Sequence, residues 1–249
     1  MKKRLNFIDE LRGLLIILVC LYHFGYDLIA FCGLPMDWFW NDWPVQGGRD
    51  IITGSLIIIS GISCSLSSNN LKRGAKTFAV AMLLSLITYL IMPSETIVFG
   101  ILHFFGICML LWGLVGRYIK IPVKIGIPIC ALLFTLLRFL SQGVLLIPFI
   151  GYRPLPTALY QSRFLFWLGL PHASFFSADY YPILPWGVLF LAGGILGSSW
   201  KKAAFPTWFY PSRIPALSLL GRHTLIIYLV HQPLFIGILL LAVKFTTNS

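Results

Sequence analysis

The sequence predicts an all-α, polytopic membrane protein of about seven transmembrane helices, with its N-terminus in the cytoplasm. Three observations favour this class: 58% of the 249 residues are hydrophobic, 11% are charged, and the mean hydropathy is +0.85. A soluble domain carries about 25% charged residues. The sequence also lacks the alternating segments of about ten residues that mark a membrane β-barrel. We expect residues 1–249 to form one transmembrane domain.

Seven apolar stretches are each close to the length of about 20 residues that a bilayer requires. The segment 141–180 between the fifth and sixth stretches is also apolar but is broken by Pro and Gly, which predicts short interfacial or re-entrant helices packed over a cavity. An eighth span within 155–172 is the alternative, and it would invert the loops that follow. The seven predicted spans are 11–31, 50–68, 75–92, 97–116, 121–140, 181–200 and 217–243.

The basic residues are distributed unevenly between alternate loops. Fourteen of the nineteen Lys and Arg residues belong to the N-terminus, to the loops after the second, fourth and sixth spans, or to the span ends beside them, with Arg12 and Arg222 counted in this set. This asymmetry places the N-terminus in the cytoplasm and the C-terminus outside. The net charge of +11 is therefore interpreted as a topology signal, and we expect no nucleic-acid partner. The five cysteines form no CxxC pair and are interpreted as small buried hydrophobic residues.

The first span carries charged residues inside an apolar run, ELRGLLIILVCLYHFGYDL. Arg12 and His23 are eleven residues apart, so they share a helix face about 16 Å apart along the axis. Asp9 and Asp27 lie about one turn beyond them on the same stripe. A charge at the bilayer centre costs at least ~3 kcal/mol, so the stripe must line a bundle interior or a wet cavity. It is either an interior ion pair that fixes packing or a polar path through the membrane.

Two further histidines lie in predicted spans. His103 belongs to FGILHFFGI in the fourth span and His231 to YLVHQPL in the last. We expect Arg12, His23 and these two histidines to converge on one cavity, because each is too polar to face lipid. HExxH and CxxC motifs are missing, so no metal is expected. P-loop and GxGxxG motifs are missing as well, which gives ATP-driven transport no support.

Several segments, taken in order, resemble the acyltransferase superfamily of membrane proteins. FIDELRGLLIILVCLYH has the superfamily's Asp-x-x-Arg-Gly followed by an apolar helix and a His, here Asp9, Arg12, Gly13 and His23. ITGSLIIISGIS is similar to its second span and LGRHTLIIYLVHQPL to its last. Within that group, SSNNLKRG, FGILHFFGI and FFSADYYPILPWGVLFLAGGILG most resemble bacterial relatives of heparan-alpha-glucosaminide N-acetyltransferase.

The resemblance implies a reaction and roles for residues. An acetyl group would pass from cytoplasmic acetyl-CoA to an amine or hydroxyl of an extracytoplasmic glycan or amino sugar, at a bacterial inner membrane. His23 would act as general base, since the ordinary pKa of histidine lies near neutrality, and Asp27 would orient it. His103 and His231 are the further catalytic candidates. The basic residues expected to hold the CoA phosphates are Arg12, Lys72, Arg73, Lys76 and Arg222.

One departure limits the resemblance to the lysosomal members of the family. Their catalytic His lies in the segment after the first span, whereas 31–50 of this chain contains no His. The position that matches His23 is not a His in those members. The role of His23 therefore follows the wider superfamily, and a heparan substrate is not implied.

A secondary transporter or proton-coupled permease is the alternative function. Arg, His and Asp inside spans also mark ion paths, although the inverted-repeat halves of many transporters are not evident here. A non-catalytic membrane interaction protein is the third hypothesis. Membrane lipids are expected partners, and the sequence leaves open a homo-oligomer and the choice between N- and O-acylation.

Overall fold

A computed structural model describes residues 4–247, without the side chains at 243 and 245–247. The chain divides into two compact units, one formed by 1–56 and 205–249 and the other by 57–204. Helix α3 (Trp43–Leu66) begins in the first unit and ends in the second. The prediction of a single domain over the whole chain stays a prediction.

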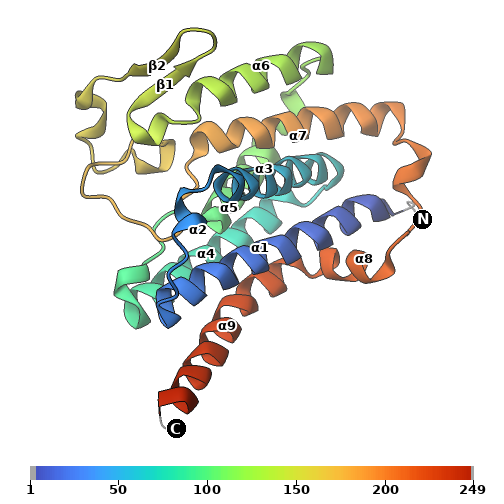
Figure 1. Cartoon of the computed structure of the whole chain (residues 1–249). Coiled ribbons are helices and arrows are strands. Elements are labelled where there is room, and N and C mark those ends of the chain that lie inside the picture. Colours follow the sequence, from blue (N-terminus) through green and yellow to red (C-terminus); the bar gives the residue numbers. More distant parts are fainter. Residues whose placement is uncertain (1–3, 248–249) are drawn as a thin grey trace. The chain divides into compact units, whose positions relative to one another are not determined.

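The first unit is built around α1 (Asn6–Cys32), which packs against α8 (Pro215–Arg222) and α9 (Thr224–Thr247). Figure 1 shows α8 and α9 following α1 along its length. The 3₁₀ turn η6 (Thr207–Phe209) also contacts α1. The predicted charged stripe of the first span therefore belongs to the helix at the centre of this unit.

Glycines allow α1 and α8 to approach backbone to backbone. A Cβ at Gly13 of α1 would collide with the carbonyl of Leu217, and one at Gly221 of α8 would collide with the carbonyl of Asp9. Small residues at helix crossings in membranes permit this kind of close packing. The Gly13 of the Asp-x-x-Arg-Gly sequence thus has a structural reason to be glycine.

The C-terminal end of α1 is closed by a glycine and followed by a short helix. Gly33 adopts a φ of 63°, and its N–H bonds to the carbonyl of Ile29, which satisfies the helix end. Helix α2 (Asp37–Asn41) follows and buries Phe39, whose ring stacks on Tyr22 of α1 at 5.0 Å.

The predicted last span, 217–243, is wrong in its outline because it contains a break. Helix α8 ends at Arg222 and α9 begins at Thr224, with His223 between them. The hydroxyl of Thr224 donates to the carbonyl of Gly221 at 2.7 Å, which satisfies a carbonyl at the end of α8. The junction itself is polar, with Arg222, His223 and Thr224 in sequence, but the apolar residues on either side of it led to the prediction of one continuous span.

The second unit contains the rest of α3 and four more helices. Helix α4 (Asn70–Ile91) packs against α5 (Ile101–Val115). Helix α7 (Ile183–Ala203) contacts both α5 and α6 (Val123–Leu137). The core includes Ile57, Phe104, Trp112 and Phe190, with Cys64 and Cys108 among them. The prediction of buried cysteines is confirmed for these two and Cys130 but is wrong for Cys20 and Cys32, which are half-buried.

Seven helices of the described chain are long and apolar enough to cross a membrane, which confirms the predicted all-α polytopic class. They are α1, α3, α4, α5 with the 3₁₀ turn η2 (Gly116–Tyr118), α6 with η3 (Leu140–Gln142), α7 and α9. The first two begin earlier than predicted, at Asn6 and Trp43. The acidic residues Asp9 and Glu10 therefore lie inside α1.

The predicted helices of 141–180 are wrong, because this segment forms a β-hairpin and turns. Strand β1 (Val144–Ile147) pairs antiparallel with β2 (Gly151–Pro154), and the 3₁₀ turns η4 (Thr157–Tyr160) and η5 (Phe166–Leu168) follow. The eighth span over 155–172 is therefore also wrong. Repeated Pro and Gly interrupt any helix here, and the β-branched and leucine residues between them favour strands.

Two half-buried tyrosines hydrogen-bond to backbone carbonyls in and beside this segment. Tyr160 donates its hydroxyl hydrogen to the carbonyl of Leu140, and Tyr180 donates to the carbonyl of Phe166. Burial raises the pKa of both phenols above the ordinary value, so both stay protonated donors. The 3₁₀ turn η1 (Pro93–Glu95) lies between α4 and α5.

Candidate active site

Two histidines meet where α1 packs against α9. The ring centroids of His23 and His231 are 5.0 Å apart, with an angle of 61° between the ring planes. Tyr228, one turn before His231, places its ring 5.4 Å from His231 and 6.5 Å from His23. His231 is 6% exposed and His23 is half-buried. Two of the three histidines predicted to lie in spans therefore share one site.

A buried carboxylate lies one turn beyond His23. Asp27 is fully buried, and its Oδ1 accepts a hydrogen bond from Nε2 of Gln232 at 2.6 Å. This bond joins α1 to α9 at the residue that follows His231. Gln232 thereby fixes the carboxylate beside the histidine pair, and the role of Asp27 in orienting His23 stays a prediction.

Two acceptor atoms at this contact are buried and have no hydrogen-bond partner within residues 4–247: Nε2 of His231 and Oε1 of Gln232. The other ring nitrogen of His231, Nδ1, lies 2.7 Å from the carbonyl oxygen of Tyr228. A carbonyl oxygen only accepts, so Nδ1 carries the proton and Nε2 of the neutral ring is an acceptor. The amide of Gln232 donates to Asp27, which leaves its Oε1 as the second acceptor.

An apolar groove with a volume of about 320 Å³ lies beside the histidine pair in the first unit. Leu220 at one end is two residues before Arg222. Phe24 and Phe235 are at the other end, and the ring of Phe235 is 5.8 Å from that of His231. Neither histidine lines the groove, and Phe235 is the lining residue whose ring contacts His231. Its lining is Ile16, Ile17, Cys20, Leu21, Phe24, Leu220, Ile227 and Phe235.

His103 lies in the second unit and has partners of its own. Its Nδ1 accepts the backbone N–H of Gly100 at 3.2 Å, and its Nε2 is 3.2 Å from the hydroxyl of Ser85. Because Nδ1 accepts, Nε2 carries the proton and donates to Ser85. Asp179 accepts the N–H of Ile101 at 2.8 Å beside it. His103 therefore stabilises the N-terminal turn of α5, and its predicted convergence with the other histidines stays a prediction.

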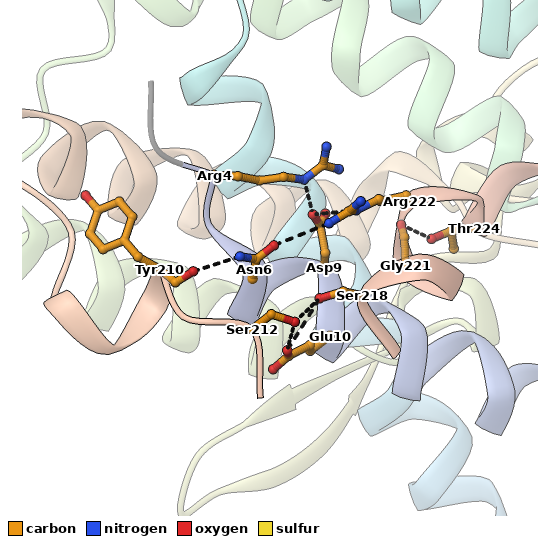
Figure 2. Close-up of polar contacts among 10 residues, drawn as sticks. All are labelled: Arg4, Asn6, Asp9, Glu10, Tyr210, Ser212, Ser218, Gly221, Arg222 and Thr224. Atoms are coloured by element: carbon orange, nitrogen blue, oxygen red, sulfur yellow. Dashed lines mark hydrogen bonds and ion pairs between the residues drawn. The ribbon is translucent and has the colours of Figure 1, made fainter. Parts of the chain in front are cut away.

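The predicted phosphate-binding arginine of α8 is tied to the start of α1 (Figure 2). Asp9 pairs with Arg4 at 2.6 Å and with Nε of Arg222 at 3.9 Å, both through Oδ2. Nη2 of Arg222 also donates to Asn6 at 3.5 Å. Arg222 remains largely exposed, and Arg12 is half-exposed one turn along α1 from Asp9. These cations lie at the end of α1 from which the groove begins.

The other predicted phosphate-binding residues belong to the second unit. Lys72, Arg73 and Lys76 lie in the first two turns of α4, and all three are exposed. They therefore form a basic patch at the N-terminal end of α4, directly after the sequence SSNN. Whether the patch and Arg222 bind one ligand together stays a prediction.

Glu10 is a buried acidic residue for which the sequence suggested no role (Figure 2). Its Oε1 accepts the backbone N–H groups of Arg213 at 2.7 Å and Ile214 at 3.0 Å, and the hydroxyls of Ser212 at 3.0 Å and Ser218 at 3.4 Å. Glu10 thus supplies the acceptor that the N-terminus of α8 requires. The missed signal was a second acidic residue directly after Asp9 in an apolar helix.

Tyr228 and Gln232 were missed as well. Both are polar residues of LIIYLVHQPL: Tyr228, three residues before His231, shares its helix face, whereas Gln232 follows it directly and lies about 100° around the helix. No group of three or more His, Cys, Asp or Glu residues that could hold a metal ion occurs among the described residues.

The chain matches a known protein family over most of its length. A family model described as heparan-alpha-glucosaminide N-acetyltransferase, catalytic, matches residues 4–233. The match covers α1, the histidine pair and the basic residues of α4 and α8. No curated protein and no solved structure matches the chain.

Proposed function

This chain belongs to the heparan-alpha-glucosaminide N-acetyltransferase catalytic family of membrane proteins, and we propose that it transfers an acetyl group from cytoplasmic acetyl-CoA to an amine or hydroxyl of an extracytoplasmic glycan. The enzyme would lie in the inner membrane of a bacterium. Family membership favours this function over a secondary transporter. The fold is multi-pass, as such a transfer across a membrane requires.

The observation that carries the proposal is the contact of His23 with His231 between α1 and α9. Their ring centroids are 5.0 Å apart, and a buried carboxylate, Asp27, lies one turn away. Histidine exchanges protons near neutral pH, which suits it to deprotonate an amine or hydroxyl. His23 is half-buried, so a substrate can reach its ring more readily than that of His231.

The chemistry needs one proton acceptor and one leaving group. His23 removes the proton from the acceptor nitrogen or oxygen as that atom attacks the carbonyl carbon of the acetyl thioester. The new C–N or C–O bond forms and the C–S bond breaks, so CoA leaves as the thiolate. The thiolate then takes up the proton, which restores His23.

The donor is proposed to approach from the Arg12 and Arg222 end of α1. Guanidinium groups bind phosphate through paired hydrogen bonds, and CoA carries several phosphate charges. The apolar groove from Leu220 to Phe24 offers a path for the arm that carries the thioester. Over the eight residues from Ile16 to Phe24, α1 rises about 12 Å towards the histidines.

The proposal is tested with purified protein in proteoliposomes that contain radiolabelled acetyl-CoA on the side of Arg222 and glucosamine on the other. We expect labelled N-acetylglucosamine to accumulate on the glucosamine side. Substrate-dependent proton flux without any acetylated amine or hydroxyl would contradict acyl transfer and favour the transporter. A set of amino sugars and neutral sugars then separates N- from O-acylation.

A further inference from the structure

The two acceptor atoms of α9 that have no partner within residues 4–247 differ from ordinary buried polar groups. Nearly all buried polar side-chain atoms in proteins are hydrogen-bonded, and each exception needs an explanation. Nε2 of His231 and Oε1 of Gln232 belong to adjacent residues, and both residues face α1 through His23 and Asp27 respectively. Both atoms are of the same kind, since each accepts hydrogen bonds.

We propose that Nε2 of His231 binds the acceptor substrate by accepting a hydrogen bond from its hydroxyl or amine, with Oε1 of Gln232 as a second acceptor for a neighbouring donor group. The proposal rests on the proposed acyl transfer and names the part of the site that recognises the acceptor. The ligand class is a molecule with two neighbouring donor groups, such as the adjacent hydroxyls or the amine and hydroxyl of a sugar.

The backbone of α9 sets this role for His231. Nδ1 is held at 2.7 Å by the carbonyl of Tyr228, so the proton of the neutral ring is fixed on the side away from the substrate. The ring is also in contact with Tyr228 and Phe235, at 5.4 and 5.8 Å, which limit its rotation. Nε2 is therefore a preorganised acceptor rather than one that must choose between tautomers.

The same atoms discriminate between the two substrates. The carbonyl oxygen of an acetyl thioester is only an acceptor, so it gains nothing from a second acceptor such as Nε2 of His231. A sugar hydroxyl or amine brings donor hydrogens and satisfies the buried atom. A buried acceptor that finds no donor on the ligand loses its hydration without a replacement, which costs free energy. Such a site therefore rejects ligands that lack the donor group.

Two substitutions at one position separate the possible roles of His231. The amide of Asn stands the same number of bonds from Cβ as Nδ1, so His231→Asn keeps a donor for the Tyr228 carbonyl and removes the acceptor at Nε2. The amide oxygen of Gln stands where Nε2 does, so His231→Gln keeps the acceptor and loses the bond to Tyr228. Neither amide is basic.

The experiment measures kcat and the KM values for glucosamine and acetyl-CoA in proteoliposomes, with thermal unfolding followed for each variant. We expect His231→Asn to raise the KM for glucosamine by roughly 5- to 150-fold, with His231→Gln nearer to wild type. The KM for acetyl-CoA and the thermal unfolding of His231→Asn should stay near wild type.

Three results would overturn the inference. If His231 only stabilises the helix through Tyr228, then His231→Asn is tolerated and His231→Gln is the impaired variant. If His231 is the general base, both variants lose kcat together with little change in KM. If the wild-type protein acetylates neither glucosamine nor any other sugar, the proposed function itself fails, and the inference fails with it.

Discussion

His103 of the second unit and His231 of the first are both buried, and each uses Nδ1 to form a hydrogen bond with a backbone group three residues before it. Nδ1 of His103 accepts this bond, whereas Nδ1 of His231 donates it. At His103 the N–H of Gly100 donates to Nδ1, so the remaining proton lies on Nε2 and is donated to Ser85. At His231 the carbonyl of Tyr228 accepts from Nδ1, so Nε2 is left as an acceptor without a partner in the described chain.

Burial and aromatic neighbours alone therefore do not separate the role that we propose for His231 from the role that we propose for His103. Both side chains are deeply buried, at 2% and 6% exposure, and both contact aromatic rings. The direction of the backbone contact at Nδ1 decides whether the second nitrogen, Nε2, is a donor, as in His103, or an acceptor, as in His231. Variants of the two regions should therefore fail in different ways.

The largest expected effect is at the histidine pair of the first unit. His23→Gln keeps a polar side chain of similar size but has no basic nitrogen, so kcat for acetyl transfer should fall by roughly 10²–10⁴-fold. Binding of CoA and thermal unfolding should change little. Near-native turnover in this variant would remove His23 from the chemistry and direct attention to His231.

The next effect concerns where CoA binds. Arg73→Glu reverses an exposed charge in the basic patch of α4, whereas Arg153→Glu reverses an exposed charge of the hairpin strand β2. A lost charge-assisted contact to phosphate should raise the Kd of CoA by roughly 10- to 100-fold at Arg73 only. Isothermal titration of CoA compares them, and equal weakening by both would refute the proposed donor side.

At His103 the effect should be on stability instead of catalysis. His103→Ala leaves the N–H of Gly100 and the hydroxyl of Ser85 without this partner, so it should lower the free energy of unfolding by about 1–3 kcal/mol. His103→Asn is the matched variant, because its amide oxygen can still accept from Gly100. A large loss of kcat in His103→Asn, with normal thermal unfolding, would show that the assignment of His103 is wrong.

The smallest effect is expected at the carboxylate that caps α8. Glu10→Ala removes the acceptor for the N–H groups of Arg213 and Ile214, and loss of such a cap costs about 0.5–2 kcal/mol. Glu10→Gln retains an acceptor oxygen and should lose less. Differential scanning calorimetry in detergent measures both, and an unchanged Tm in Glu10→Ala would show that Glu10 does not hold this helix end.

Much of the fold was predictable because its signals are local. Apolar runs of about 20 residues and the loop charges depend only on composition, and the structure confirms seven candidate spans. The break at His223 was missed, since the short polar run of Arg222, His223 and Thr224 lies inside a longer apolar stretch that was read as one span. The hairpin at 144–154 was also missed, because short apolar runs between Pro and Gly suit strands as well as interfacial helices.

The candidate site was predictable only in part. The spacing of Asp9, Arg12 and His23 identified the polar face of α1, because helical periodicity fixes which residues share a face. The partner of that face depends on which helices pack together, so Gln232 as the donor to Asp27 could not be read from sequence. The same limit applies to Glu10, whose partners lie more than 200 positions away in the sequence.

The central claim is that the proton leaves the acceptor at the α1–α9 histidine pair and not at His103. The most direct measurement is the ratio of kcat for His103→Asn to kcat for His23→Gln, in matched proteoliposomes at saturating acetyl-CoA and glucosamine. The account predicts a ratio of at least about 100, because only the His23 variant loses a general base. A ratio near one, or one below one, would contradict it.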